Sequence, residues 1–145
     1  MNDNMRVVAR AVVVQDGKVL LCWMIDGNHH FFPGGGVEFK ESAVETLKRE
    51  FCEELGVEMR EATFIGIAEN VFTVKGIEAH EINLVFSATI DEAPTESKEK
   101  HITFSWVAVN ELERGNVLPM HLVKSVVKWL QDGKTFWIGL NSEES

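Results

Sequence analysis

The spacing of the apolar residues changes its period at residue 42 of this chain. Before that point the sequence is rich in valine and reads as strands. After it, apolar residues recur at steps of three and four: Val44, Leu47, Phe51 and Leu55. That spacing predicts an amphipathic helix over Ser42–Leu55, ended by Gly56. Three glycines, Gly34–Gly36, come shortly before the helix and predict a loop with unusual backbone angles.

Strands are predicted on both sides of this helix. Arg6–Val14 and Val19–Ile25 flank the turn signal Asp16–Gly17, which predicts a hairpin. Further strands are expected at Asn28–Phe32, Glu61–Val74, His80–Ile90 and Ile102–Val107. A short helix over Val109–Arg114 and a second long helix between Pro119 and Asp132–Gly133 complete the pattern. The mixture predicts an α/β fold with helices packed on a mixed, twisted sheet.

The length, net charge and cysteine content of the chain limit the number of domains and the classes of function that it can have. The 145 residues suit one domain over 1–145, with a frayed tail at 141–145. The net charge of −9 argues against an extended nucleic-acid surface, and an anionic substrate would need a cation between it and the protein. No apolar run is long enough to span a membrane. Cys22 and Cys52 lie in apolar stretches, which predicts reduced core thiols in a cytoplasmic protein.

Three carboxylates share one face of the predicted helix. Glu50, Glu53 and Glu54 stand at i, i+3 and i+4, where like charges cost a helix a few tenths of a kcal/mol per pair. A cation between them would remove that cost, and hard oxygen ligands suit Mg²⁺ or Mn²⁺. An acidic helix face can equally be only solvated. The glycine run can aim peptide groups at a phosphate or a metal, or can form a simple tight turn.

The segment from Gly35 to Val57 resembles the signature box of the Nudix hydrolases. The box reads glycine, five spacers, Glu41, seven spacers, Arg49-Glu50, an apolar residue, one spacer, Glu53-Glu54, one spacer, glycine and an aliphatic residue. Every fixed position is filled. The resemblance implies the Nudix fold, an α/β/α sandwich around a mixed sheet, and metal-dependent hydrolysis of a pyrophosphate bond.

The resemblance also implies roles for single residues. The metal ligands would be Glu50, Glu53, Glu54 and the carbonyl of Gly35, and Gly34, Gly35 and Gly36 would lie against the substrate. Arg49 would pair with Glu41 to hold the carboxylates in register, although a plain surface ion pair is the alternative. Glu53 is the favoured general base. Because some family members use a glutamate outside the box, Glu99 is the second candidate.

The box leaves the substrate open beyond a nucleoside diphosphate linked to another group. Markers of ADP-ribose, dinucleoside-polyphosphate and coenzyme A hydrolases are missing, which favours a nucleoside triphosphate or a related small nucleotide. ADP-ribose or nucleotide-sugar hydrolysis, removal of a 5′ pyrophosphate from RNA, and a silent nucleotide-binding module are the alternatives. Whether the chain is a monomer or a homodimer is also open.

Aromatic side chains near strand ends could stack a base, although most such residues belong to cores. The candidates are Trp23, Phe31, Phe32, Phe72 and Trp106. His29 and His30 precede the glycines and could touch phosphate, or they could be exposed bystanders.

Overall fold

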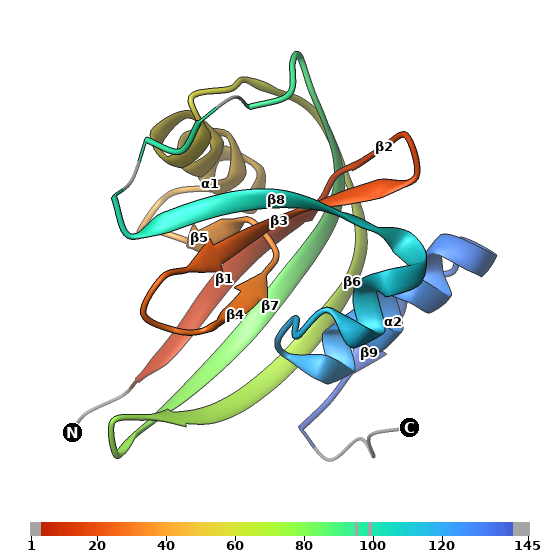
Figure 1. The fold of residues 1–145 in the computed structure, drawn as a ribbon. Helices are drawn as coiled ribbons and strands as arrows, with labels where there is room; N and C mark the ends of the chain where they lie inside the picture. Colours follow the sequence, from red (N-terminus) through yellow and green to blue (C-terminus); the bar gives the residue numbers. More distant parts are fainter. Residues whose placement is uncertain (1–3, 95, 99, 141–145) are drawn as a thin grey trace.

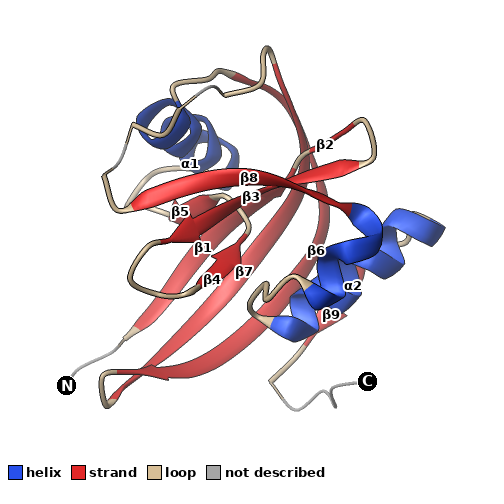
Figure 2. Cartoon of the chain, in the orientation of Figure 1, coloured by secondary structure: helices blue, strands red, loops and turns tan. Residues whose placement is uncertain are grey.

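Two β-sheets form the centre of the computed structural model, with helices on either side of the strands (Figures 1 and 2). The structure describes residues 4–94, 96–98 and 100–140. The strands are β1 (Met5–Val12), β2 (Val14–Gln15), β3 (Lys18–Met24), β4 (His29–Phe31), β5 (Gly34–Gly36), β6 (Met59–Val74), β7 (Ile77–Ile90), β8 (Ile102–Ala108) and β9 (Phe136–Ile138). The helices are α1 (Ala43–Glu50), the π-helical turn η1 (Phe51–Leu55), the 3₁₀ helix η2 (Val109–Arg114) and α2 (Met120–Asp132).

The larger sheet is mixed and has the order β5-β1-β7-β6-β9. β1 runs parallel to β7 and antiparallel to β5, while β6 and β7 form one long hairpin. The smaller sheet contains β2, β3 and β4, with β8 paired to β3. Apolar residues form two cores, one around α1 that includes Leu47 and Phe51, and one around α2 that includes Leu122 and Val126. The predicted α/β fold with a mixed sheet is confirmed.

The predicted hairpin between the first two strands is wrong. β1 pairs with β5 and β7, and only the two-residue strand β2 pairs with β3 across the turn. The turn itself is confirmed, since Asp16 and Gly17 both have positive φ. The reason for the difference lies in β1, where Val8, Ala9, Ala11 and Val12 are all buried. A strand that is apolar on both faces belongs in the middle of a sheet.

The glycine run is a strand and not the predicted loop. Gly34–Gly36 forms β5, an edge strand in which Gly35 lies opposite Ala9 of β1. The unusual backbone angle is present at Gly34, whose φ is 147°. A Cβ there would overlap the carbonyl oxygen of Ala9. The close approach of the two backbones therefore requires glycine, and the same approach completes the pairing.

The predicted helices are present with small changes at their ends. Ser42 caps α1 in a capping box with Glu45, and Gly56 ends η1 in the left-handed conformation. The last turn of the first predicted helix is π-helical, which its residue spacing did not indicate. η2 has the predicted bounds, and α2 ends before Gly133. No helix among the described residues is long and apolar enough to cross a membrane.

Three smaller expectations have mixed outcomes. Cys22 is buried as predicted, but Cys52 is exposed on η1 because it lies on the side turned away from Phe51 and Leu55 of the core. β9 was not predicted, because three residues carry too little periodicity to be recognised. The tail at 141–145 lies outside the described residues.

Candidate functional site

Arg49 on α1 holds the connection between β5 and α1 in place. Its Nε donates to Glu41 Oε2 at 2.8 Å and its Nη2 donates to Glu41 Oε1 at 3.0 Å, a bidentate pair. Thr46 Oγ1 also donates to Glu41, at 2.6 Å. These hydrogen bonds, that from Arg49 foremost, lower the pKa of Glu41 to about 2. The pairing implied by the resemblance is thus present in the structure.

The same guanidinium reaches the acidic residues of the helix. Arg49 Nη1 lies 3.0 Å from Glu50 Oε1 and 3.5 Å from Glu53 Oε2. Its Nη2 donates to the carbonyl oxygen of Gly36 at 3.2 Å. Its hydrogen bonds to Glu41 and Glu50 raise the pKa of Arg49, despite an opposing effect of burial. One positive charge therefore brings Glu50 and Glu53 together beside the glycine strand.

Glu50 occupies space that only a glycine strand leaves open. Its carboxylate lies against Gly35, where a Cβ would overlap the carboxylate oxygen. The Glu50 side chain is 16% exposed, whereas that of Glu53 is 53% exposed. Carboxylate oxygens at the open edge of a sheet suit a hard divalent cation, and the missing Cβ provides the room. The chemistry of these oxygen donors therefore fits a hard divalent cation.

The three carboxylates are not equivalent, contrary to the simple helical spacing. Glu54 is buried, and its charge acts on Arg10 and Cys22 inside the fold. A π-helical turn contains more residues than an α-helical one, so the side chains after Glu50 are rotated from their α-helical directions. Within the described part of the chain, no three acidic, histidine or cysteine side chains form a ready-made metal cage. Arg49 lies between the carboxylates instead.

Glu99, the second candidate base, lies outside the described residues. Its neighbour Lys98 is described, and the Lys98 backbone N–H donates to the carbonyl oxygen of Glu54 at 2.7 Å. Lys98 therefore lies beside the end of the acidic helix.

A pocket of about 570 Å³ opens between β4, the β6–β7 hairpin and the start of α2. It is mostly apolar and has the aromatic rings of Phe31 and Phe72 in its wall. Sequence reasoning did not single out its polar residues Arg10, Asn70 and Glu81, because each is an isolated residue in a strand. The remaining lining residues are Met24, His29, Thr73, Val74, Leu118, Pro119, Met120 and His121.

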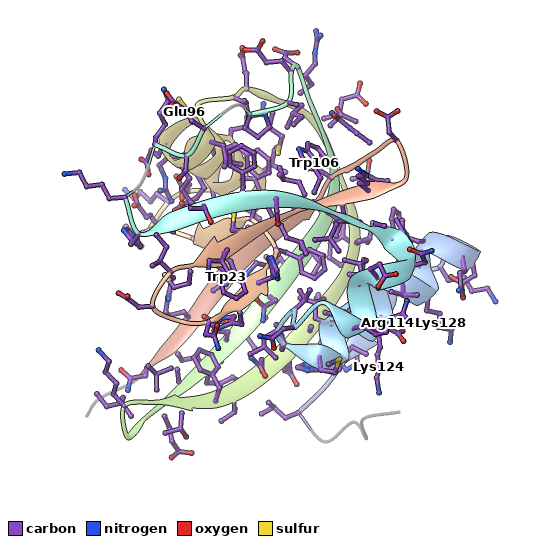
Figure 3. The ribbon with its side chains drawn as sticks, in the orientation of Figure 1. Trp23, Glu96, Trp106, Arg114, Lys124 and Lys128 are labelled. Carbon is purple, nitrogen blue, oxygen red and sulfur yellow. The ribbon has the colours of Figure 1, made fainter. Side chains whose placement is uncertain are left out.

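The other three candidates for base stacking do not line this pocket and pack against protein residues. Phe32 is 1% exposed in the core, and Trp106 on β8 packs against the core around α1 (Figure 3). Trp23 on β3 meets His30 edge-on, with 4.7 Å between ring centroids. His30 Nδ1 is also 2.9 Å from the carbonyl oxygen of Gly115, so this histidine connects β4 to the end of η2, whereas His29 lines the pocket.

Arg6 on β1 lies between the pocket and the glycine strand. Its Nη1 is 3.9 Å from Glu81 Oε2 in the pocket wall. The other end of the same guanidinium lies over Gly36, where a Cβ would come within 2.6 Å of Nη2. Glu50 lies against Gly35 on the opposite face of the same edge strand, because successive residues of a strand face opposite sides of the sheet. Arg6 supplies positive charge between the pocket and β5.

Comparisons with known proteins agree with this arrangement. The family model of the NUDIX domain matches residues 5–129. The fold resembles the Mutator MutT protein of Bacillus halodurans, with 26% identity, a TM-score of 0.71, and 91% of this chain and 86% of that chain covered. It also resembles the MutT protein of Methanosarcina mazei, with 23% identity, a TM-score of 0.73, and 93% and 99% of the two chains covered.

A third similar structure is a NUDIX hydrolase from Nitrosomonas europaea, with 23% identity, a TM-score of 0.72, and 97% and 96% of the two chains covered. No curated protein matches the chain. The match to the family model extends over most of the sequence and contains the whole glycine–glutamate segment. The chain therefore belongs to the Nudix hydrolase family, the pyrophosphohydrolases that act on nucleotide-linked substrates.

Proposed function

We propose that this protein hydrolyses a pyrophosphate bond of a nucleoside triphosphate in a reaction that depends on Mg²⁺ or Mn²⁺. The observation that carries the proposal is the position of Arg6, which lies between the apolar, aromatic-walled pocket and Gly36 of the edge strand that Glu50 meets on its other face. In this proposal the substrate extends from the pocket around that edge to Glu50. A pocket of about 570 Å³ is in the range that accommodates a nucleoside. The base would lie between aromatic rings, and the phosphate chain would lie over the glycine strand.

In this proposal the reacting phosphate lies beside the acidic residues of α1 and η1. Glu50 and Glu53, with the carbonyl of Gly35 and with Glu54 on the inner side, would hold the divalent cation. Such a cation supplies neutralisation of the pyrophosphate oxygens and activation of the attacking water. Arg49 keeps Glu50 and Glu53 in register through its hydrogen bonds to both. Gly34, Gly35 and Gly36 allow the phosphates to approach the backbone closely.

Glu53 is the proposed general base. Its side chain is half exposed, whereas Glu50 lies against Gly35 and Glu54 is buried. It can therefore face the attacking water and take its proton while the less exposed carboxylates remain in place. The connection between Arg49 and Glu41 holds the helix end but does not touch the reacting atoms in this scheme. Both residues are positioning residues.

A substrate panel tests the proposal. Nucleoside triphosphates, ADP-ribose, nucleotide sugars and 5′-triphosphorylated RNA are incubated with Mg²⁺ or Mn²⁺, and the products are identified. A triphosphatase of the proposed kind releases pyrophosphate or phosphate and a nucleoside mono- or diphosphate. Faster cleavage of ADP-ribose or nucleotide sugars would overturn the substrate class, and no cleavage together with nucleotide binding would indicate a silent binding module. The net charge of −9 makes RNA the least suitable member of the panel.

A further inference from the structure

The base end of the pocket contains a carboxylate, which a pocket for polyanions would not be expected to contain. Glu81 on β7 is 8% exposed and lines the pocket. Asn70 lies directly opposite it on β6, and Arg10 approaches from β1. Apart from these three residues and two histidines, the lining is almost entirely apolar. Polar groups placed in this way in an apolar pocket fix the orientation of a ligand.

The Glu81 carboxylate has unused capacity to accept hydrogen bonds. Its oxygens lie 3.9 Å from Arg6 Nη1 and 4.0 Å from Arg10 Nη2, which is beyond hydrogen-bonding distance. Arg10 instead donates to the carbonyl oxygen of Phe32 at 3.1 Å and to Asn83 Oδ1 at 3.4 Å. Among the described residues, none hydrogen-bonds to the Glu81 carboxylate. The carboxylate is ion-paired with two guanidinium groups, and a ligand that brings N–H groups would supply the hydrogen bonds that these ion pairs do not.

The two charges of Glu81 and Arg10 form a pattern that a nucleobase can match. A carboxylate accepts from two neighbouring N–H groups, while the adjacent guanidinium donates to an oxygen. On their pairing edges, adenine and cytosine present one amino donor beside a ring nitrogen acceptor, and uracil presents one N–H between two carbonyls. Guanine alone presents two neighbouring donors, N1–H and the 2-amino group, followed by the O6 acceptor. The rings of Phe31 and Phe72 offer faces for stacking.

We infer that Glu81 and Arg10 make this pocket selective for the guanine base, with Glu81 accepting from N1–H and the 2-amino group and Arg10 donating to O6. The inference rests on the proposed nucleotide hydrolysis, and it names the nucleotide that this site prefers. Arg10 already contacts the face of Phe31, with 5.8 Å from its Cζ to the ring centroid, so it lies beside the stacking surface. Asn70 is adjacent and can hydrogen-bond at the border of the same edge.

The first experiment varies the ligand and leaves the protein unaltered. kcat/KM is measured for GTP, ATP, CTP, UTP and ITP, whose hypoxanthine base lacks only the 2-amino group. We expect GTP to exceed ITP and each other nucleotide by roughly 10- to 100-fold, the discrimination of one bidentate contact to a base. Equal values for GTP and ITP would overturn the inference while leaving nucleotide hydrolysis intact.

Binding of the nucleoside monophosphates in chelator, measured by calorimetry, separates the two proposals. If no triphosphate is hydrolysed but GMP binds more tightly than IMP, the proposed reaction fails and the base preference stands. If GMP and IMP bind equally, the base preference fails whatever the activity.

The second experiment uses Glu81→Gln, with Glu78→Gln as the control. Glu78 is exposed on the same strand outside the pocket. Glutamine has one acceptor and one amide donor, so Glu81→Gln is expected to reduce the GTP to ITP ratio of kcat/KM towards one, mainly through KM. A merely structural role for Glu81 would reduce both substrates equally and keep the ratio, and that result would overturn the inference. Should Glu81→Gln not fold, the comparison of GTP with ITP on the unaltered protein still decides.

Discussion

Arg49 shares its charge among four carboxylates around the end of α1. It forms ion pairs with Glu38, Glu41, Glu50 and Glu53 at 3.7, 2.8, 3.0 and 3.5 Å. Only the pair with Glu41 is short and bidentate, so that pair fixes the guanidinium, and the others follow from its position. In the proposed mechanism Arg49 and Glu41 are therefore positioning groups, whereas Glu50 and Glu53 remain available to a cation.

Replacement of Glu53 tests its role as the general base. Glu53→Gln keeps the size of the side chain and removes its charge, so we expect kcat to fall by about 10²- to 10⁴-fold. The melting temperature is expected to change little, because the side chain is half exposed. Steady-state kinetics and thermal unfolding check both, with the exposed Glu58→Gln as the matched control. Near-full activity of Glu53→Gln would remove it as the base and make Glu99 the next residue to replace.

The low pKa of Glu41 predicts a pH dependence of stability. Its pKa is held at about 2, against an ordinary value of 4.5, chiefly by the Arg49 hydrogen bond. Because the folded-state pKa is the lower one, ionised Glu41 adds stability at pH values above 4.5, and this contribution disappears as the pH falls towards 2. Thermal unfolding of the protein and of Glu41→Gln across this range measures it. We expect the difference in melting temperature to shrink with acidity, and a constant difference would contradict the prediction.

The glycine strand β5 connects the fold to the candidate site, because it pairs with β1 and lies against Glu50. Gly35→Val places a side chain where the Glu50 carboxylate lies, so Glu50 must move. We expect activity to be lost while the metal-free protein stays folded, because β5 is an edge strand and valine suits strands. Specific activity and melting temperature are measured on the same variant.

Gly76→Ala is the control for Gly35→Val. Gly76 is in the β6–β7 turn at a φ of 79°, with no atom near a Cβ, so alanine is strained there but touches nothing. It should lower the melting temperature and leave specific activity unchanged. A stable Gly35→Val enzyme with the original rate would show that the glycines only form the strand.

The sequence predicted the positions of the helices and strands better than it predicted which strands pair with one another. The periodic segments of α1, α2, β6 and β7 were predicted because their apolar residues repeat at a helical or strand period. The partner of β1 could not be predicted, since its pairing with residues 75 positions further along the chain depends on the tertiary fold, which the local pattern does not contain. The glutamates of the candidate site were predicted from their match to the Nudix box, because their helical spacing alone is equally typical of a solvated acidic face. Arg10, Asn70 and Glu81 were not, because they meet only after three strands align.

The net charge of the molecule predicts that hydrolysis depends on a divalent cation. The proposed nucleotide substrate is a polyanion, whereas the protein has a net charge of −9. Among the described residues, Arg6 and Arg10 lie beside the pocket, and Arg49 beside the glycine strand already forms ion pairs with four carboxylates. We therefore expect a chelator to abolish hydrolysis and Mg²⁺ or Mn²⁺ to restore it. Arg49 already neutralises part of the acidic cluster, so the chelator should change the melting temperature little. Hydrolysis at an undiminished rate in chelator, with metal content measured as nil, would contradict the mechanism, whereas a parallel loss of fold and activity would show that the cation is structural.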